Sequence, residues 1–142
     1  MTRRRVLFVC THNSARSQMA EGFLRALAGD RFEVASAGTE ARGVHPFAVQ
    51  AMAEEGIDIS LQSSKTVDRF VDERFDLVIT VCDEAAEACP VFSNAAERRH
   101  WSFPDPSAVG GDDEERFAAF AQVRDAIRER VEREVIAEDV AV

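Results

Sequence analysis

Cys10 and Arg16 are the two side chains of this sequence whose types and spacing best suit chemistry. The apolar run from Val6 to Val9 leads into Cys10, and an amphipathic stretch follows Arg16. This order predicts a buried strand, a tight loop and a helix start. Backbone N–H groups of such a loop converge on one point and bind an anion. The Arg16 guanidinium matches an oxyanion in bidentate fashion, and the same positive field favours a Cys10 thiolate. The sequence therefore predicts an oxyanion held against a nucleophilic sulfur.

The residues between and just after this pair are the candidate anion-binding positions. The Ser17 hydroxyl could stabilise a Cys10 thiolate by a hydrogen bond, or it could be an ordinary first-turn residue of the helix. His12 could shape the anion site, and we assign it no chemistry of its own. The full candidate set comprises Thr11, His12, Asn13, Ser14, Ala15, Arg16 and Ser17.

Two further cysteines, Cys82 and Cys89, complete an odd and low cysteine count that argues against a structural disulfide framework. They could be two half-buried thiols around a short helix. If Cys10 and Cys82 end neighbouring strands about 4.8 Å apart, they could instead meet. A helical segment would hold the Cα atoms of Cys82 and Cys89 about 10.5 Å apart, beyond disulfide range, so their pairing requires this segment to unwind.

Asp105 lies between Pro104 and Pro106, which restrict the backbone on both sides of the carboxylate. Such a carboxyl group could protonate a departing oxygen as a general acid. Aspartate is also common in turns for purely structural reasons. The position of Asp105 after a predicted strand favours the general acid.

Composition restricts the class of protein further. The chain has 142 residues, enough for one domain with a real core, and residues 1–142 are predicted to form that domain. Its net charge of −9 argues against nonspecific binding to nucleic acid or anionic membranes. The sequence contains no span-length apolar segment, and the apolar run after residues 3–5 is too short for a secretion signal. We expect a cytoplasmic monomer.

Strands alternate with helices along the chain, which predicts an α/β fold with a four-stranded parallel sheet flanked by helices on both faces. In such sheets ligands bind at the carboxyl ends of the strands, where Cys10, Cys82 and Asp105 are all expected. The first helix should be capped by Asn13 or Ser14 and should bury Leu27. The predicted strands span residues 4–10, 32–37, 76–82 and 98–103, and the predicted helices span residues 15–28, 45–55, 66–72 and 113–136.

Together these motifs resemble the thioredoxin-coupled arsenate reductases, which share a fold and an anion loop with low-molecular-weight protein tyrosine phosphatases and are related to flavodoxin in architecture. The resemblance covers almost the whole chain. It rests on three cysteines and an aspartate in order, not on the loop alone. The matching segments are residues 10–17, Cys82, Cys89 and residues 100–106.

The resemblance implies a mechanism for each matching residue. The loop from Cys10 to Arg16 binds arsenate, the Cys10 thiolate attacks arsenic, and Asp105 protonates the leaving oxygen. Cys82 then attacks Cys10, which releases arsenite, and Cys89 moves the disulfide to Cys82–Cys89. Thioredoxin reduces that bond, so no metal or bound cofactor is implied. Phosphate and sulfate should compete with arsenate for the loop.

Some members of this family hold a monovalent cation behind the loop, with residues that correspond to Asn13, Glu21 and Ser36. An acidic ligand of that site is replaced here by Lys65. We expect the Lys65 ammonium to substitute for the cation, which would make the protein independent of potassium. The cysteine and histidine spacings suggest no other metal site.

Three alternatives to this function remain, one of which is also a reductase. A tyrosine phosphatase would use the same loop, but such phosphatases usually carry tyrosines near the general acid, and this chain has none. A reductase served by a low-molecular-weight thiol would rely less on three cysteines. A phosphocarrier would need Cys10 but neither the cysteine pair nor the general acid. A redox sensor would form its disulfide with an oxidant alone, without consuming an oxyanion.

Overall fold

The computed structural model describes residues 3–83, 87 and 95–140. Most element bounds agree with the sequence prediction within two residues. The strands are β1 (Arg4–Cys10), β2 (Phe32–Gly38), β3 (Phe75–Thr80) and β4 (Ala95–His100). The helices are α1 (Arg16–Ala28), α2 (Pro46–Ala53), α3 (Asp113–Val131) and α4 (Ala137–Val140), with short 3₁₀ turns η1 (Val67–Phe70) and η2 (Pro106–Ala108) and a π-helical turn η3 (Glu132–Ile136) between α3 and α4.

The four strands form one parallel sheet in the order β2-β1-β3-β4, as the alternation of strands and helices predicted. From β1 the chain moves to one side to make β2 and then to the other side to make β3. The carboxyl end of β1 is therefore the point where strand order switches, the usual ligand position in such sheets. Cys10 lies at this end of β1.

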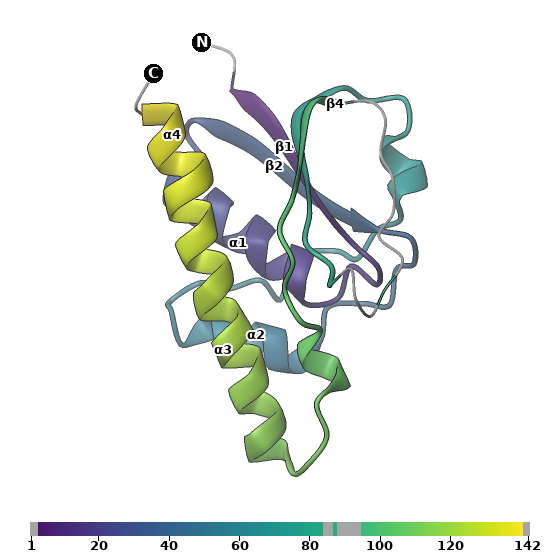
Figure 1. Ribbon diagram of the computed structural model, residues 1–142, viewed down its shortest axis with the longest axis vertical. Coiled ribbons are helices and arrows are strands. Elements are labelled where there is room, and N and C mark those ends of the chain that lie inside the picture. Colours follow the sequence, from purple (N-terminus) through teal and green to yellow (C-terminus); the bar gives the residue numbers. More distant parts are fainter. Residues whose placement is uncertain (1–2, 84–86, 88–94, 141–142) are drawn as a thin grey trace.

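Alternate residues of β1 enter two different cores because successive side chains of a strand point to opposite faces. Val6 and Phe8 join the larger core, which includes residues of α1, α2 and α3. Leu7 and Val9 join a smaller core with Phe70 of η1. Figure 1 shows the long α3 lying beside α1 and α2. Within the described residues, the main helices therefore cover one face and η1 covers the other.

Two details of α1 differ from the sequence prediction. The residue at its N-cap is Ala15, without any side-chain cap, so the expected caps Asn13 and Ser14 are wrong. Both belong instead to the tight turn that precedes the helix. Leu27 is 40% exposed although its spacing suggested burial. Leu24 and Ala28 are both buried in the larger core, so the buried face of α1 reaches its last turn and leaves Leu27 at its margin.

The strands β3 and β4 end earlier than predicted. β3 stops at Thr80, two residues before Cys82. β4 begins at Ala95 and ends before Trp101 and Phe103, the buried residues that suggested a later strand. Among the described strands, β4 pairs with β3 alone and is largely exposed, so backbone pairing defines it without an apolar pattern.

The C-terminal helix is also less regular than predicted. A single helix over residues 113–136 was expected, but the α-helix gives way to the π-helical turn at Glu132. None of the described helices is both long and apolar enough to cross a membrane.

Candidate active site

The Cys10 thiol lies buried at the carboxyl end of β1 and is free. Its Sγ is 2.8 Å from the Ser17 hydroxyl and accepts a hydrogen bond from the Asn13 N–H at 3.1 Å. The Asn13 backbone has a φ of 46°, a left-handed conformation that asparagine tolerates better than most residues. The contact between Ser17 and Cys10 that the sequence suggested is therefore present.

The peptide groups of the loop point in a consistent direction. The carbonyl groups of Thr11, His12 and Ser14 accept hydrogen bonds from backbone N–H groups in residues 40–45. In a planar trans peptide the following N–H points the opposite way. The N–H groups of residues 12, 13 and 15, which follow these carbonyl groups, therefore point away from residues 40–45. This arrangement suits a loop that offers its N–H groups to an anion.

Asn13 holds the loop together from inside rather than facing a ligand. It is fully buried, and its side-chain amide donates to the Ser17 hydroxyl at 2.8 Å and to the Ser36 hydroxyl at 2.9 Å. Its Oδ1 accepts the backbone N–H of Lys65 at 2.7 Å. Asn13 therefore joins the loop to α1, to β2 and to the chain before η1.

Several residues support the loop although no pattern in the sequence indicates this role. The Gln18 amide donates to the Asn13 carbonyl at 3.1 Å, and the Ser64 hydroxyl donates to the same carbonyl at 2.8 Å. A Cβ on Gly38 would lie 2.8 Å from the Asn13 nitrogen and from the Cys10 carbonyl oxygen. Only glycine lets the loop approach β2 this closely.

Arg16 begins α1 and is 3% exposed. One guanidinium nitrogen donates to the Phe103 carbonyl at 3.2 Å. The two terminal nitrogens also face the two carboxylate oxygens of Glu87, at 2.5 and 2.9 Å. Sequence reasoning missed Glu87, because one glutamate in an acidic segment has no distinguishing pattern.

Asp105, in the loop after β4, also lies close to the Arg16 guanidinium. Its Oδ2 lies 3.8 Å from the Arg16 guanidinium, while its Oδ1 accepts hydrogen bonds from the Ser107 N–H at 2.9 Å and the Ser107 hydroxyl at 2.7 Å. The side chain is 19% exposed. The fold thus brings Cys10, Arg16 and Asp105 together, although the last two are 89 residues apart in the sequence.

Cys82 lies just beyond the end of the strand next to β1. β3 pairs Val9 with Thr80, and the Val81 N–H donates to the Val9 carbonyl at 2.9 Å. Cys82 is buried and disulfide-bonded, and because Cys10 is free, that disulfide is not with Cys10. Cys89 lies outside the described residues.

His12 and Ala15 make no side-chain contact that suggests chemistry. The His12 ring lies 3.9 Å from the Glu40 carboxylate and is one-quarter exposed. Ala15 is buried in the larger core. These two positions belong to the loop through their backbone alone.

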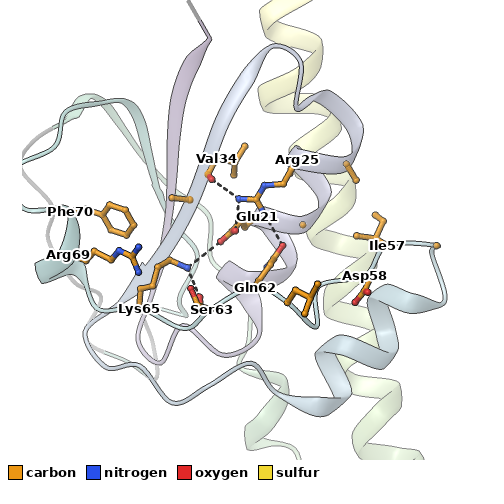
Figure 2. A pocket seen from close by; sticks show the side chains of 15 residues that line it. Glu21, Arg25, Val34, Ile57, Asp58, Gln62, Ser63, Lys65, Arg69 and Phe70 are labelled. Atoms are coloured by element: carbon orange, nitrogen blue, oxygen red, sulfur yellow. Dashed lines mark hydrogen bonds and ion pairs between the residues drawn. The ribbon is translucent and has the colours of Figure 1, made fainter.

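Behind the loop, the buried Glu21 carboxylate accepts the Ser36 hydroxyl at 2.5 Å. Figure 2 shows Lys65 and Arg25 pointing toward Glu21 from different sides of a pocket of about 710 Å³. The Lys65 ammonium lies 3.9 Å and the Arg25 guanidinium 2.6 Å from this carboxylate. Burial lowers the pKa of Lys65, and Arg69 and Arg25 lower it further, against the raising effect of Glu21.

These residues do not fit a monovalent cation, because two fixed positive charges already face the single carboxylate. In the part of the chain that the structure describes, no group of three or more histidine, cysteine, aspartate or glutamate residues could hold a metal ion.

The family of low molecular weight phosphotyrosine protein phosphatases matches residues 5–140 of this chain. The arsenate reductase of Halalkalibacterium halodurans is 50% identical over 131 residues, which covers 92% of this chain and 94% of that protein. The chain belongs to the arsenate reductases of this family.

Solved structures of arsenate reductases share the fold. One, in a phosphate-binding state, is 36% identical with a TM-score of 0.77 and covers 95% of this chain and 98% of its own. The thioredoxin-dependent arsenate reductase of Corynebacterium glutamicum is 29% identical with a TM-score of 0.62, covering 92% of this chain and 61% of its own.

Proposed function

We propose that this arsenate reductase reduces arsenate to arsenite through Cys10, Cys82 and Cys89 and is regenerated by thioredoxin, with residues 1–142 acting as one catalytic domain in the cytoplasm. The observation that carries the proposal is the meeting of a free Cys10 thiol, the Arg16 guanidinium and the Asp105 carboxylate at one sheet edge, next to a disulfide-bonded Cys82. A phosphatase needs the first three groups but not the disulfide.

Arsenate binds the loop in this mechanism through the N–H groups and the Arg16 guanidinium. The Cys10 sulfur attacks arsenic, and Asp105 supplies the proton that lets one oxygen leave as water. The Ser17 hydroxyl, 2.8 Å from Cys10 Sγ, donates to the thiolate before the attack. The product of this step is a Cys10–arsenic thioester, with arsenic still pentavalent.

Reduction occurs when the Cys82 thiolate attacks the Cys10 sulfur. The sulfur–arsenic bond breaks, its electron pair stays on arsenic, and arsenite leaves while a Cys10–Cys82 disulfide forms. Cys89 then attacks Cys82 and returns Cys10 to a free thiol. A free Cys10 beside a disulfide-bonded Cys82 is the arrangement expected after that last exchange.

The reductant proposed for that final disulfide is thioredoxin, by analogy with the Corynebacterium glutamicum relative. Phosphate and sulfate are proposed as competing oxyanions, in agreement with the phosphate-binding state of another relative. Selectivity for arsenate then comes from chemistry, because thiols reduce arsenate but not phosphate.

The deciding experiment compares two substrates. With thioredoxin, thioredoxin reductase and NADPH, we expect arsenate-dependent NADPH oxidation, and only weak hydrolysis of an aryl phosphate by the same preparation. A low-molecular-weight thiol in place of thioredoxin should support little turnover. A protein inert toward arsenate that hydrolyses the aryl phosphate efficiently would be a phosphatase, and the proposal would be wrong.

We also expect the same arsenate turnover in potassium and in sodium chloride at equal ionic strength, because Lys65 and Arg25 already balance Glu21. Restoring a carboxylate with Lys65→Asp should create a potassium dependence, visible both in the rate and as a rise in Tm specific to potassium. Lys65→Met is the matched control and should not respond. A several-fold activation of the unmodified protein by potassium over sodium would contradict this assignment.

A further inference from the structure

Glu87 occupies the edge of the Arg16 guanidinium that its two terminal nitrogens form. Both of its carboxylate oxygens face terminal nitrogens of Arg16, at 2.5 and 2.9 Å, in an end-on, bidentate geometry by which arginine binds carboxylate or phosphate. The pair is well shielded, since the Arg16 side chain is 3% exposed and that of Glu87 is 12% exposed. The two terminal nitrogens of one guanidinium hold one bidentate anion at a time, so an oxyanion that uses both of them excludes Glu87.

The backbone also holds Glu87 in this place. Its N–H donates to the Asp83 carbonyl at 3.0 Å, and its Oε2 accepts the Asp83 N–H at 3.2 Å. Asp83 directly follows the disulfide-bonded Cys82. Through its contacts with Asp83, the Glu87 carboxylate on Arg16 is therefore linked to Cys82, whose redox state changes in the proposed mechanism.

The charge of Glu87 is fixed under physiological conditions. Hydrogen bonds from the Arg16 guanidinium lower the pKa of Glu87 to about 2, against the opposing effect of burial. A carboxyl group with a depressed pKa stabilises the folded protein above its ordinary pKa, and this contribution is lost only as the pH falls toward 2. Protonation therefore does not release Glu87 from Arg16 near neutral pH, and only a competing anion or a rearrangement of the chain can do so.

We propose that the Glu87 carboxylate is an internal occupant of the oxyanion subsite on Arg16, which fills that subsite while Cys82 is in its disulfide. This inference rests on the anion-binding role of the loop given in the proposed function. Reduction of the disulfide releases Glu87 so that arsenate can reach Arg16, and Glu87 returns to Arg16 once Cys82 has left Cys10. Glu87 thereby keeps abundant oxyanions such as phosphate from occupying the loop before the disulfide has been reduced.

Two ligands that exclude one another weaken each other's binding by the same factor. If the disulfide favours Glu87 on Arg16, the oxidised protein must bind phosphate more weakly than the reduced protein. Removing the Glu87 charge should abolish most of that difference. The coupling between redox state and phosphate affinity is the quantity to measure.

The test is calorimetric titration of inorganic phosphate into the intact protein, in its disulfide form and after reduction with dithiothreitol. We expect oxidised Glu87→Gln to bind phosphate about tenfold more tightly than the oxidised unmodified protein, a coupling of ordinary size. Reduction should tighten binding by the unmodified protein and change Glu87→Gln little. Glu114→Gln, which removes one exposed negative charge at the start of α3, is the matched control and should behave like the unmodified protein.

A second readout follows alkylation of the free Cys10 thiol in the oxidised protein, with the modified peptide identified by mass spectrometry. Glu87→Gln should increase the rate with anionic iodoacetate much more than the rate with neutral iodoacetamide, because the anion uses the vacated guanidinium. Equal increases would indicate simple opening of the site and would overturn the proposal.

Phosphate binding tests the role of Glu87 and the anion loop separately. Phosphate binding that is the same in the unmodified protein and in Glu87→Gln, in both redox forms, overturns the role of Glu87 and leaves the anion loop intact. Phosphate that binds none of the proteins overturns the anion loop, and this inference with it. Arsenate turnover is measured independently of either result.

Discussion

Serine in place of Cys10 should lower arsenate turnover by roughly 10³-fold or more, because the nucleophile that attacks arsenic is lost. Cys82→Ser and Cys89→Ser should also stop steady-state turnover, but each at a different step. The coupled NADPH assay would record all three variants as inactive. A measurement of arsenite released in a single turnover separates them.

In that measurement the reduced protein is mixed with arsenate in the absence of thioredoxin. The unmodified protein and Cys89→Ser should each release about one arsenite per molecule, since the attack of Cys82 on Cys10 completes the reduction. Cys10→Ser and Cys82→Ser should release none. Arsenite from Cys82→Ser would show that another thiol completes the reduction and would remove Cys82 from the proposed relay. Thermal unfolding of each variant checks that the substitution has not disturbed the fold.

Arg16→Lys should lower kcat/KM for arsenate by roughly 10²–10³-fold, the usual effect of losing one oxyanion donor. Lysine keeps the positive charge, so the loss reports the planar, two-nitrogen geometry of the guanidinium. Arg16 is 3% exposed and donates to the Phe103 carbonyl, which fixes the orientation of its guanidinium. A flexible ammonium cannot reproduce two parallel hydrogen bonds to the oxyanion.

Arg133→Lys is the matched control, because Arg133 is 59% exposed and pairs with Glu129 and Glu134 on the C-terminal helix. It should leave kcat/KM unchanged. Steady-state kinetics over a range of arsenate concentrations, in phosphate-free buffer, checks both variants. If Arg16→Lys retained activity within about threefold of the unmodified protein, charge alone would account for anion binding and the bidentate role of Arg16 would be wrong.

The first third of the fold could be predicted well because its determinants are local. An uninterrupted apolar run fixes β1, and the apolar spacing of Met19, Ala20, Phe23 and Leu24 fixes the buried face of α1. Cys10 and Arg16 lie at the junction of these two elements. Their proximity to one anion site therefore follows from a few consecutive residues.

The edge strand of the sheet and the ends of helices and strands were predicted less well, because they depend on residues that are distant in the chain. β4 exists because its backbone pairs with β3, and its mostly exposed side chains give no periodic signal. Because Trp101 and Phe103 are apolar and buried, the predicted strand was placed too late in the chain, over residues that follow β4. The cap of α1 failed for a related reason, since Asn13 is occupied by Ser36 and Lys65 from other parts of the chain.

The sequence by itself determined the chemistry that is available: a thiol after a buried strand, an arginine at a helix start, two more cysteines and an aspartate between prolines. Only the tertiary structure decided which groups meet. Arg16 and Glu87 are 71 residues apart, and their contact depends on the strand order that places β3 beside β1. A buried guanidinium stabilises the nearest well-placed carboxylate, and no local pattern in a chain of 26 acidic residues identifies which one that is.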